Sequence, residues 1–329
     1  MNFNLIRRPR RNRINKSVRA LVSENQLRVS DLIMPLFVIE GENKKQEISS
    51  MPGIFRFSRD LLVRECEKLY KLGVPAVVLF PALNDSLKDK TATESYNDLG
   101  LYQRTLKDIK KAVPELTLMT DVAMDPYSSD GHDGYVNDKG EIENDRTLEI
   151  LAKMSLSQAQ AGADIIAPSD MMDGRVAYLR EALDQNGFEN VGILSYTAKY
   201  ASSYYGPFRE ALESAPKQGD KKTYQMDPAN VREALLETQE DIEEGADMIM
   251  VKPGLPYLDV VRAVSEVSLV PVAVYNVSGE YSMAKAAGLN GWIDYQKVVL
   301  ETLLSFKRAG ADMILSYHTA EAAKWLKEN

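Results

Sequence analysis

The sequence predicts a (β/α)8 TIM barrel that is preceded by an extended N-terminal arm. The first observation is a Gly-Ala-Asp junction that recurs at 162–164, 245–247 and 310–312, each time after an amphipathic stretch and before a short apolar run. A glycine ends a helix in the left-handed conformation without steric cost, and a short apolar run is typical of a strand buried on both faces. The junction therefore indicates a repeated turn from helix to strand.

The second observation is the number of such units. The predicted strands are 32–39, 76–81, 116–121, 164–169, 191–196, 247–252, 271–276 and 312–317. The predicted helices between them include 59–72, 145–161, 229–244 and 295–309, the third starting at Asp227-Pro228. Alternating strands and helices indicate a parallel sheet, and eight units in about 300 residues fit a closed barrel better than an open sheet. Residues 26–329 are thus predicted to form one catalytic domain.

Composition excludes several classes of protein. The chain has 329 residues, 44% hydrophobic and 27% charged, and no run approaches the roughly 18 apolar residues that a membrane span needs. We therefore expect a soluble, cytoplasmic protein. Cys66 is the only cysteine, which excludes an internal disulfide and a thiolate metal cluster. With His132 and His318 as the only histidines, zinc has few good ligands.

The first 25 residues are predicted to form the arm. Seven arginines and lysines and no acid lie in the first twenty, although the whole chain has a net charge of −8. Such a segment fits an oligomerisation arm on the acidic surface of another subunit, a solvated tail, or a site for nucleic acid. We favour the first, because one basic run on an acidic body is a poor footprint for nucleic acid.

Two lysines close neighbouring predicted strands, Lys199 after 193–198 and Lys252 after 248–251. Catalytic groups of a barrel lie where strands end, so both lysines would face one cavity and suppress each other's protonation. Lowering the pKa of a lysine to near 7 takes about 4 kcal/mol, and the neutral amine then forms imines with ketones. The alternative is that each lysine reaches solvent or pairs with a carboxylate.

The segment from Tyr200 to Gln225 lacks long apolar periodicity and is rich in Ser, Tyr, Gly and Lys, which predicts a mobile lid. Arg209, Lys221 and Lys222 on this lid would clamp a carboxylate that enters the site. The alternative is a solvated charged loop.

Eight specific motifs are spread over nearly the whole chain. They are Arg7-Arg-Pro-Arg-Arg11, Pro35-Leu-Phe-Val38, Ser50-Met-Pro-Gly53, Ala167-Pro-Ser-Asp-Met-Met-Asp-Gly-Arg175, Ser195-Tyr-Thr-Ala-Lys-Tyr200, Tyr205-Gly-Pro-Phe-Arg209, Met250-Val-Lys-Pro-Gly254 and Val277-Ser-Gly-Glu280. In these motifs the sequence resembles the porphobilinogen synthase family, also called 5-aminolevulinate dehydratases. The resemblance implies a lyase that condenses two 5-aminolevulinate molecules to porphobilinogen with loss of two waters, an early step of tetrapyrrole and heme biosynthesis.

The resemblance also implies roles for residues. Lys199 and Lys252 would each form a Schiff base with one substrate. One substrate carboxylate would be held by Arg209 and Lys221, and the other by Ser278 and Tyr317. Many members have arginine where this chain has Lys221, which weakens bidentate binding there. Asp121, at the end of the third predicted strand, would orient a substrate amino group or move protons, or would simply pair with lysine.

Zinc-dependent members carry three cysteines where this chain has Ala123, Asp125 and Asp133. Oxygen ligands prefer magnesium to zinc, and alanine cannot ligate, so no zinc is expected. His132 and Asp130 in the same segment are ambiguous, since a single histidine in a polar loop is more often a surface residue. Glu237 lies in the helix before Lys252, where the family places a carboxylate for an activating Mg²⁺, and the resemblance favours the magnesium-type branch. The alternative is that Glu237 is an ordinary exposed residue of a helix. No organic cofactor is implied, and the arm would help to form an allosteric homo-octamer.

Two rival functions remain open at this stage. A class I aldolase also uses a barrel lysine and an imine but needs only one such lysine. A nucleic-acid protein would bind through the arm with strong salt dependence. The second lysine argues against the first rival, and the acidic body argues against the second, so we expect binding neither to nucleic acid nor to membrane.

Overall fold

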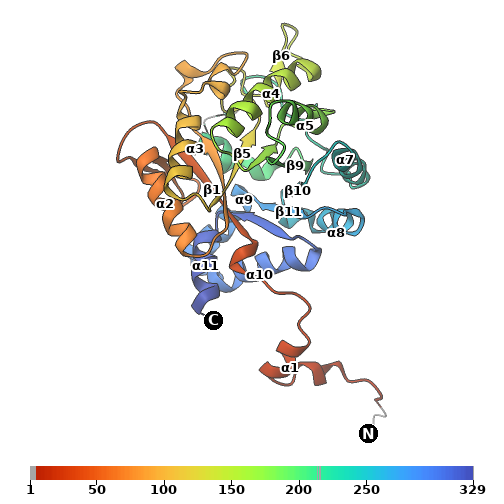
Figure 1. The fold of residues 1–329 in the computed structure, drawn as a ribbon. Helices are drawn as coiled ribbons and strands as arrows, with labels where there is room; N and C mark the ends of the chain where they lie inside the picture. The colour runs from red at the N-terminus through yellow and green to blue at the C-terminus, as the bar shows by residue number, and fades with distance from the viewer. Residues whose placement is uncertain (1–4, 213, 215, 329) are drawn as a thin grey trace.

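A computed structural model of the chain describes residues 5–212, 214 and 216–328. Its centre is a closed barrel of eight parallel strands surrounded by helices, so the predicted fold is confirmed (Figure 1). The barrel strands are β1 (Leu32–Ile39), β4 (Ala76–Pro81), β5 (Thr117–Val122), β8 (Ile165–Pro168), β9 (Gly192–Lys199), β10 (Met248–Lys252), β11 (Val272–Asn276) and β12 (Met313–Ser316). Pairing of β12 with β1 closes the barrel. Every strand of the barrel overlaps its predicted range, because the apolar runs that predict these strands are buried on both faces.

Helices connect the strands and cover the outside of the barrel. The α-helices are α1 (Lys16–Leu21), α2 (Arg59–Lys71), α3 (Leu101–Ala112), α4 (Asn144–Gln160), α5 (Arg175–Gln185), α6 (Gly206–Leu212), α7 (Arg232–Glu243), α8 (Leu258–Val267), α9 (Ser278–Leu289), α10 (Tyr295–Ala309) and α11 (Thr319–Glu328). The 3-10 turns are η1 (Pro9–Arg13), η2 (Val29–Asp31), η3 (Asp85–Leu87), η4 (Thr93–Tyr96), η5 (Ser203–Tyr205) and η6 (Leu255–Tyr257).

The predicted start of α7 at Asp227-Pro228 is wrong, since the helix begins at Arg232. The Asp227 carboxylate accepts a hydrogen bond from the N–H of Ala229 at 2.9 Å, and its carbonyl accepts one from Asn230 at 3.0 Å. Aspartate side chains stabilise such turns in competition with the first turn of a helix. The proline that suggested a helix start therefore belongs to the turn.

Four short strands were not predicted. They are β2 (Lys45–Glu47), β3 (Phe55–Ser58), β6 (Tyr135–Val136) and β7 (Ile142–Glu143). β3 pairs with the end of β1 and carries β2 at its edge, while β6 and β7 form a separate hairpin. Runs of two to four residues give too little periodicity for a strand to be recognised.

The aspartate of each Gly-Ala-Asp junction joins two barrel strands at their N-terminal ends. Its carboxylate accepts a hydrogen bond from a backbone N–H of the neighbouring strand at 2.7 to 2.9 Å, and its own N–H donates to the carbonyl of the same residue. The pairs are Asp164 with Leu118, Asp247 with Ile193, and Asp312 with Val272. Each preceding glycine has a φ between 104° and 114°, the left-handed region that the junction predicts. The junction is therefore a strand-pairing device as well as a turn.

The segment before the barrel extends away from it and carries η1 and α1 (Figure 1). Its apolar side chains at Ile6, Ile14 and Leu21 are 75% to 88% exposed. The division at residue 25 stays a prediction, and residues 1–4 of the predicted arm lie outside the described part. Of the helices that the structure describes, none combines the length and apolarity that crossing a membrane requires.

We predict that Asp247→Ala lowers the free energy of unfolding by about 1 kcal/mol, because the N–H of Ile193 loses its side-chain acceptor. Asp247→Asn should lose less, since the amide oxygen can still accept. Chemical denaturation of both variants beside wild type measures the difference. Equal stability of all three proteins would contradict a strand-pairing role for the aspartate.

Candidate active site

Lys199 and Lys252 are the last residues of β9 and β10 and are direct partners in the register of these strands. Both side chains are buried, with 6% and 5% of their surface exposed. The two lysines therefore lie side by side at the C-terminal end of the barrel, as the sequence predicts.

Aromatic rings surround the amine of Lys252. The ring centres of Tyr196, Tyr205, Phe208 and Tyr275 lie 4.7 to 5.2 Å from Nζ. Within residues 5–212, 214 and 216–328, no carboxylate forms an ion pair with this lysine. Burial, and then the nearby charge of Lys199, lower the pKa of Lys252 to about 7. A substantial fraction of this amine is therefore neutral and nucleophilic near pH 7.

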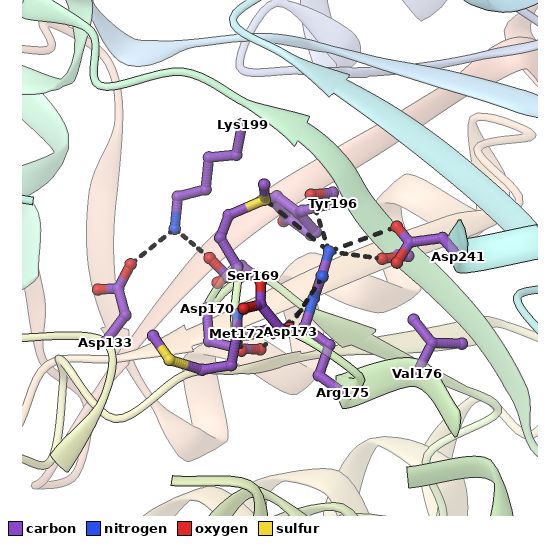
Figure 2. A network of polar contacts seen from close by, with 12 residues as sticks. Asp133, Ser169, Asp170, Met172, Asp173, Arg175, Val176, Tyr196, Lys199 and Asp241 are labelled. Carbon is purple, nitrogen blue, oxygen red and sulfur yellow. Dashed lines mark hydrogen bonds and ion pairs between the residues drawn. The ribbon is translucent and has the colours of Figure 1, made fainter. Parts of the chain in front are cut away.

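Lys199 has a different environment. Its Nζ donates to Oδ2 of Asp133 at 2.9 Å and to the carbonyl oxygen of Ser169 (Figure 2). Asp133 is fully buried, and although burial alone would raise its pKa, Lys199 and Lys221 hold that pKa well below its usual range. An ionised Asp133 thus fixes the position of the Lys199 amine.

Lys221 reaches into the same cluster from the predicted lid. Its Nζ lies 3.2 Å from Oδ2 of Asp125 and also donates to Oδ1 of Asp133. Burial opposes the charge, but the two aspartates together raise the pKa of Lys221 above its ordinary value. Gln225 adds a hydrogen bond to Asp133 at 3.3 Å. Asp125 and Asp133, two of the three positions considered for a metal, therefore pair with the amine of Lys221. The described residues contain no cluster of three or more His, Cys, Asp or Glu that could hold a metal.

Asp121, at the end region of β5, is buried beside both lysines. Burial, and then the charge of Asp125, raise its pKa to about 7, although Lys199 and Lys252 oppose this. A carboxyl group with that pKa exchanges protons readily near neutral pH.

A small cavity, about 30 Å³ open to a water-sized sphere, connects these groups. It is lined by Asp121, Asp125, Ser169, Lys199, Tyr205, Phe208, Arg209, Lys221, Gln225 and Lys252. The segment from Tyr200 to Gln225 covers it and contains η5 and α6, so it has more regular structure than its composition suggests. Backbone hydrogen bonds from Met226 to Lys199 at 3.0 Å and from Ala201 to Met226 at 2.8 Å join the two ends of this lid.

Three predicted binding residues do not line this cavity. Lys222 is exposed, and its Nζ lies 3.8 Å from Oδ2 of Asp220. The hydroxyl of Ser278 accepts a hydrogen bond from the N–H of Phe208 at 3.0 Å, which ties it to the lid. The hydroxyl of Tyr317 lies 2.9 Å from that of Tyr275, so it approaches Lys252 through a residue that borders the amine.

His132 is not a surface residue, which corrects the interpretation based on its polar loop. It is 7% exposed, its Nδ1 lies 3.1 Å from the hydroxyl of Tyr224, and its Nε2 lies 2.8 Å from the carbonyl oxygen of Gln218. Both partners belong to the lid, so the histidine joins the lid to the loop that carries Asp133.

A buried arginine supports the segment that holds Lys199. Arg175 donates from Nη2 to Oγ of Ser195 at 2.9 Å and to Oδ2 of Asp241 at 3.4 Å, and from Nη1 to the carbonyl of Met172 at 3.2 Å. Figure 2 shows this network beside the Lys199 contacts, with the 169–175 segment between them. The arginine thus connects α7, β9 and the loop after β8.

Glu237, the predicted magnesium ligand, lies on α7 apart from the lysines. It is half-buried and borders a cavity of about 490 Å³ that Glu141, Asp173 and Glu233 also line. Burial raises its pKa to about 7, and the charges of Asp241 and Glu240 add to this effect, while Arg175 opposes it. A carboxylate in such surroundings gains from a nearby cation.

Sequence reasoning missed several residues of the site. Tyr196 and Tyr275 belong to apolar strand runs and give no separate signal. Gln225 and the carbonyl of Ser169 make contacts that depend only on the folded structure. Asp133 appeared only as a metal candidate, because its partner Lys199 is 66 residues away.

Comparisons with known proteins agree on one family. The family model of delta-aminolevulinic acid dehydratase matches residues 6–325. A curated delta-aminolevulinic acid dehydratase from Synechocystis sp. is 54% identical over 324 residues, 98% of each chain. A chloroplastic one from Arabidopsis thaliana is 55% identical over 98% of this chain and 75% of that protein. The solved structure of the enzyme from Toxoplasma gondii ME49 with the reaction product porphobilinogen matches with a TM-score of 0.98 and 52% identity, over 99% of this chain and 93% of that chain.

We predict that Lys252 reacts with acetic anhydride with half-maximal rate near pH 7, because its ammonium form, which dominates below that pH, is unreactive. Competitive labelling followed by mass spectrometry of the Lys252 peptide measures this. In Lys199→Met the midpoint should rise, since one neighbouring positive charge is removed, and in denaturant it should approach the ordinary value of about 10.4. A native midpoint near 10 would contradict the role of burial.

Proposed function

Since the chain belongs to the delta-aminolevulinic acid dehydratase family and catalyses the condensation of 5-aminolevulinate to porphobilinogen, we propose which residues carry the reaction. Lys199 and Lys252 act as a pair of lysines that each form an imine with substrate. The observation that supports this most strongly is their placement: two buried lysines in direct register, one of them with a pKa of about 7. The enzyme is a lyase of porphyrin biosynthesis.

The neutral amine of Lys252 is the readier nucleophile. It adds to the ketone carbon of one substrate, and the ketone oxygen leaves as water when the imine forms. The amine of Lys199 is instead hydrogen-bonded to the carboxylate of Asp133, and it must leave this partner before it can attack the second substrate. Loss of both ketone oxygens accounts for the two waters that the condensation releases.

Asp121 is the residue that we propose for proton transfer. Formation of the carbon–carbon bond requires loss of a proton from a carbon next to a protonated imine, which acts as the electron sink. Asp121 lines the cavity with both lysines and has a pKa of about 7, whereas that of Asp133 is held too low to accept a proton at neutral pH. A base with a pKa near the operating pH is the most effective.

We propose that Arg209 and Lys221 bind the carboxylate of one substrate, and that Ser278 and Tyr317 bind that of the other. Arg209 and Lys221 both line the cavity. Lys221 would have to leave or share its contacts with Asp125 and Asp133 in order to bind substrate. Ser278 and Tyr317 bond instead to Phe208 and Tyr275, so substrate must displace these partners.

We further propose that Mg²⁺ binds at Glu237 as an activator. The half-buried carboxylate, its raised pKa and the acidic cavity beside it fit a cation. No cluster of three metal-ligating side chains gathers in the described residues, so the ion would keep most of its water. When bound, it would supply positive charge that offsets Glu237, Glu240 and Asp241.

The N-terminal segment bears on how copies of the chain assemble. The basic segment with η1 and α1 extends from the barrel and exposes apolar side chains, which fits a contact with another copy of the chain. We propose a homo-octamer that responds to Mg²⁺ and a cytoplasmic location. The two rival functions, a class I aldolase and a nucleic-acid protein, do not require a pair of buried lysines.

We predict that Lys252→Ala and Lys199→Ala each abolish porphobilinogen formation, because each removes one imine-forming amine. Borohydride added with 5-aminolevulinate should attach reduced substrate to both lysine peptides of the wild type, as measured by mass spectrometry. Lys217→Ala, an exposed lysine of the same lid, serves as the control and should keep normal activity. Near-normal turnover in either alanine variant would refute the role of that lysine.

We predict that Mg²⁺ added to metal-stripped protein raises both its activity and its thermal unfolding temperature, and that Glu237→Gln removes both responses. Size-exclusion chromatography on the same samples reports the assembly. Glu233→Gln, on the same helix and at the same cavity, should retain the responses. If the stripped wild type has full activity and unchanged stability without Mg²⁺, Glu237 is not a magnesium site.

A further inference from the structure

A chain of buried hydrogen bonds joins the segments that follow β10, β11 and β12. Its centre is Glu280, in the first turn of α9, with 5% of its surface exposed. One carboxylate oxygen accepts from the N–H of Leu255 at 2.5 Å. The other accepts from the N–H of Val277 at 2.5 Å and from the side-chain amide of Asn276 at 2.9 Å. A single carboxylate therefore links the loop after β10 to the end of β11.

The chain continues to β12. The side-chain oxygen of Asn276 accepts a hydrogen bond from the hydroxyl of Ser316 at 2.9 Å, and that hydroxyl accepts one from the N–H of His318 at 3.1 Å. Asn276 is 1% exposed and Ser316 is fully buried. Because these side chains are almost fully buried, each bond constrains the separation of the segments that it joins.

Each of the three linked segments carries a residue of the proposed reaction. These residues are Lys252, Ser278 and Tyr317. The hydrogen-bond network lies behind these three residues, since none of its members lines the cavity that contains Lys199 and Lys252.

Helix capping by itself does not explain all the hydrogen bonds of Glu280. A glutamate at the third position of a helix commonly accepts the N–H of the residue before the helix, and Val277 is that residue. The bond to Leu255 leaves the helix and reaches a loop 25 residues earlier. All three partners are donors, so the ionised carboxylate fits them better than any neutral group. Burial raises the pKa of Glu280 to about 7, while the three donors favour its charge.

We propose that Glu280 is a positioning residue that fixes Lys252 relative to Ser278 and Tyr317, and so prepares the site for the substrate that these three residues hold. This inference rests on the proposed function. Glu280 acts through backbone and side-chain hydrogen bonds and does not touch substrate.

Glu280→Gln tests the proposal, because the amide keeps the shape of the side chain but turns its NH₂ group toward at least one N–H donor. Wild type and variant are treated with 5-aminolevulinate and borohydride, and the adducts at the Lys252 and Lys199 peptides are quantified. We expect the ratio of Lys252 to Lys199 adduct to fall roughly tenfold and KM to rise by a similar factor. A general loss of stability would not change that ratio.

Asp312→Asn is the matched control. Its carboxylate also accepts a backbone N–H between β11 and β12, but at the opposite end of these strands, so the adduct ratio should not change. Ser316→Ala is a second variant, which removes the last side chain of the hydrogen-bond network. It should also lower the ratio of Lys252 to Lys199 adduct, but by a smaller factor. It provides the test if Glu280→Gln does not fold.

An unchanged adduct ratio in a folded Glu280→Gln and in Ser316→Ala would overturn the positioning role, as would an equal fall in Asp312→Asn. If the wild type forms no adduct at either lysine, the proposed function itself is overturned, and the inference with it. The wild-type adduct thus distinguishes the two failures.

Discussion

The active site depends on the balance of charge in a pocket that is almost closed to water. Six lysine and aspartate side chains are buried there, namely Lys199, Lys221, Lys252, Asp121, Asp125 and Asp133, and the exposed Arg209 also lines the pocket. Four of them form one ion-paired group, which leaves Lys252 and Asp121 outside it. A buried charge without a partner is costly, and such a group changes its protonation instead. This is why the lysine and the aspartate without ion pairs both have a pKa near 7.

Lys221 gives this site its particular character. Its amine stands between the carboxylates of Asp125 and Asp133. The positive charge beside these two aspartates is therefore that of a lysine side chain, which the lid contributes. The packing of the lid on the barrel therefore places a positive charge beside both aspartates, which links the position of the lid with the electrostatics of the cavity.

Sequence reasoning identified the barrel and the two lysines because both have local signals. Apolar runs bounded by Gly-Ala-Asp predict strands, and a lysine at the end of such a run is conspicuous. The ion pairs of Asp133 could not be predicted, since their partners lie 66 and 88 residues away and the lid that brings Lys221 has no periodic pattern. The burial of His132 was missed for the same reason, and the start of α7 was misplaced because a turn and a helix begin with similar residues.

The Gly-Ala-Asp aspartates have a consequence for how the barrel is divided. Their side chains join β5 to β8, β9 to β10, and β11 to β12, so six of the eight strands form three locked pairs. The locks sit at the end of the barrel opposite the lysines. Loops at the catalytic end can consequently vary in length and sequence without loosening the pairs. The barrel behaves as a set of two-strand modules, in which the architecture is maintained at one end and chemical novelty can accumulate at the other.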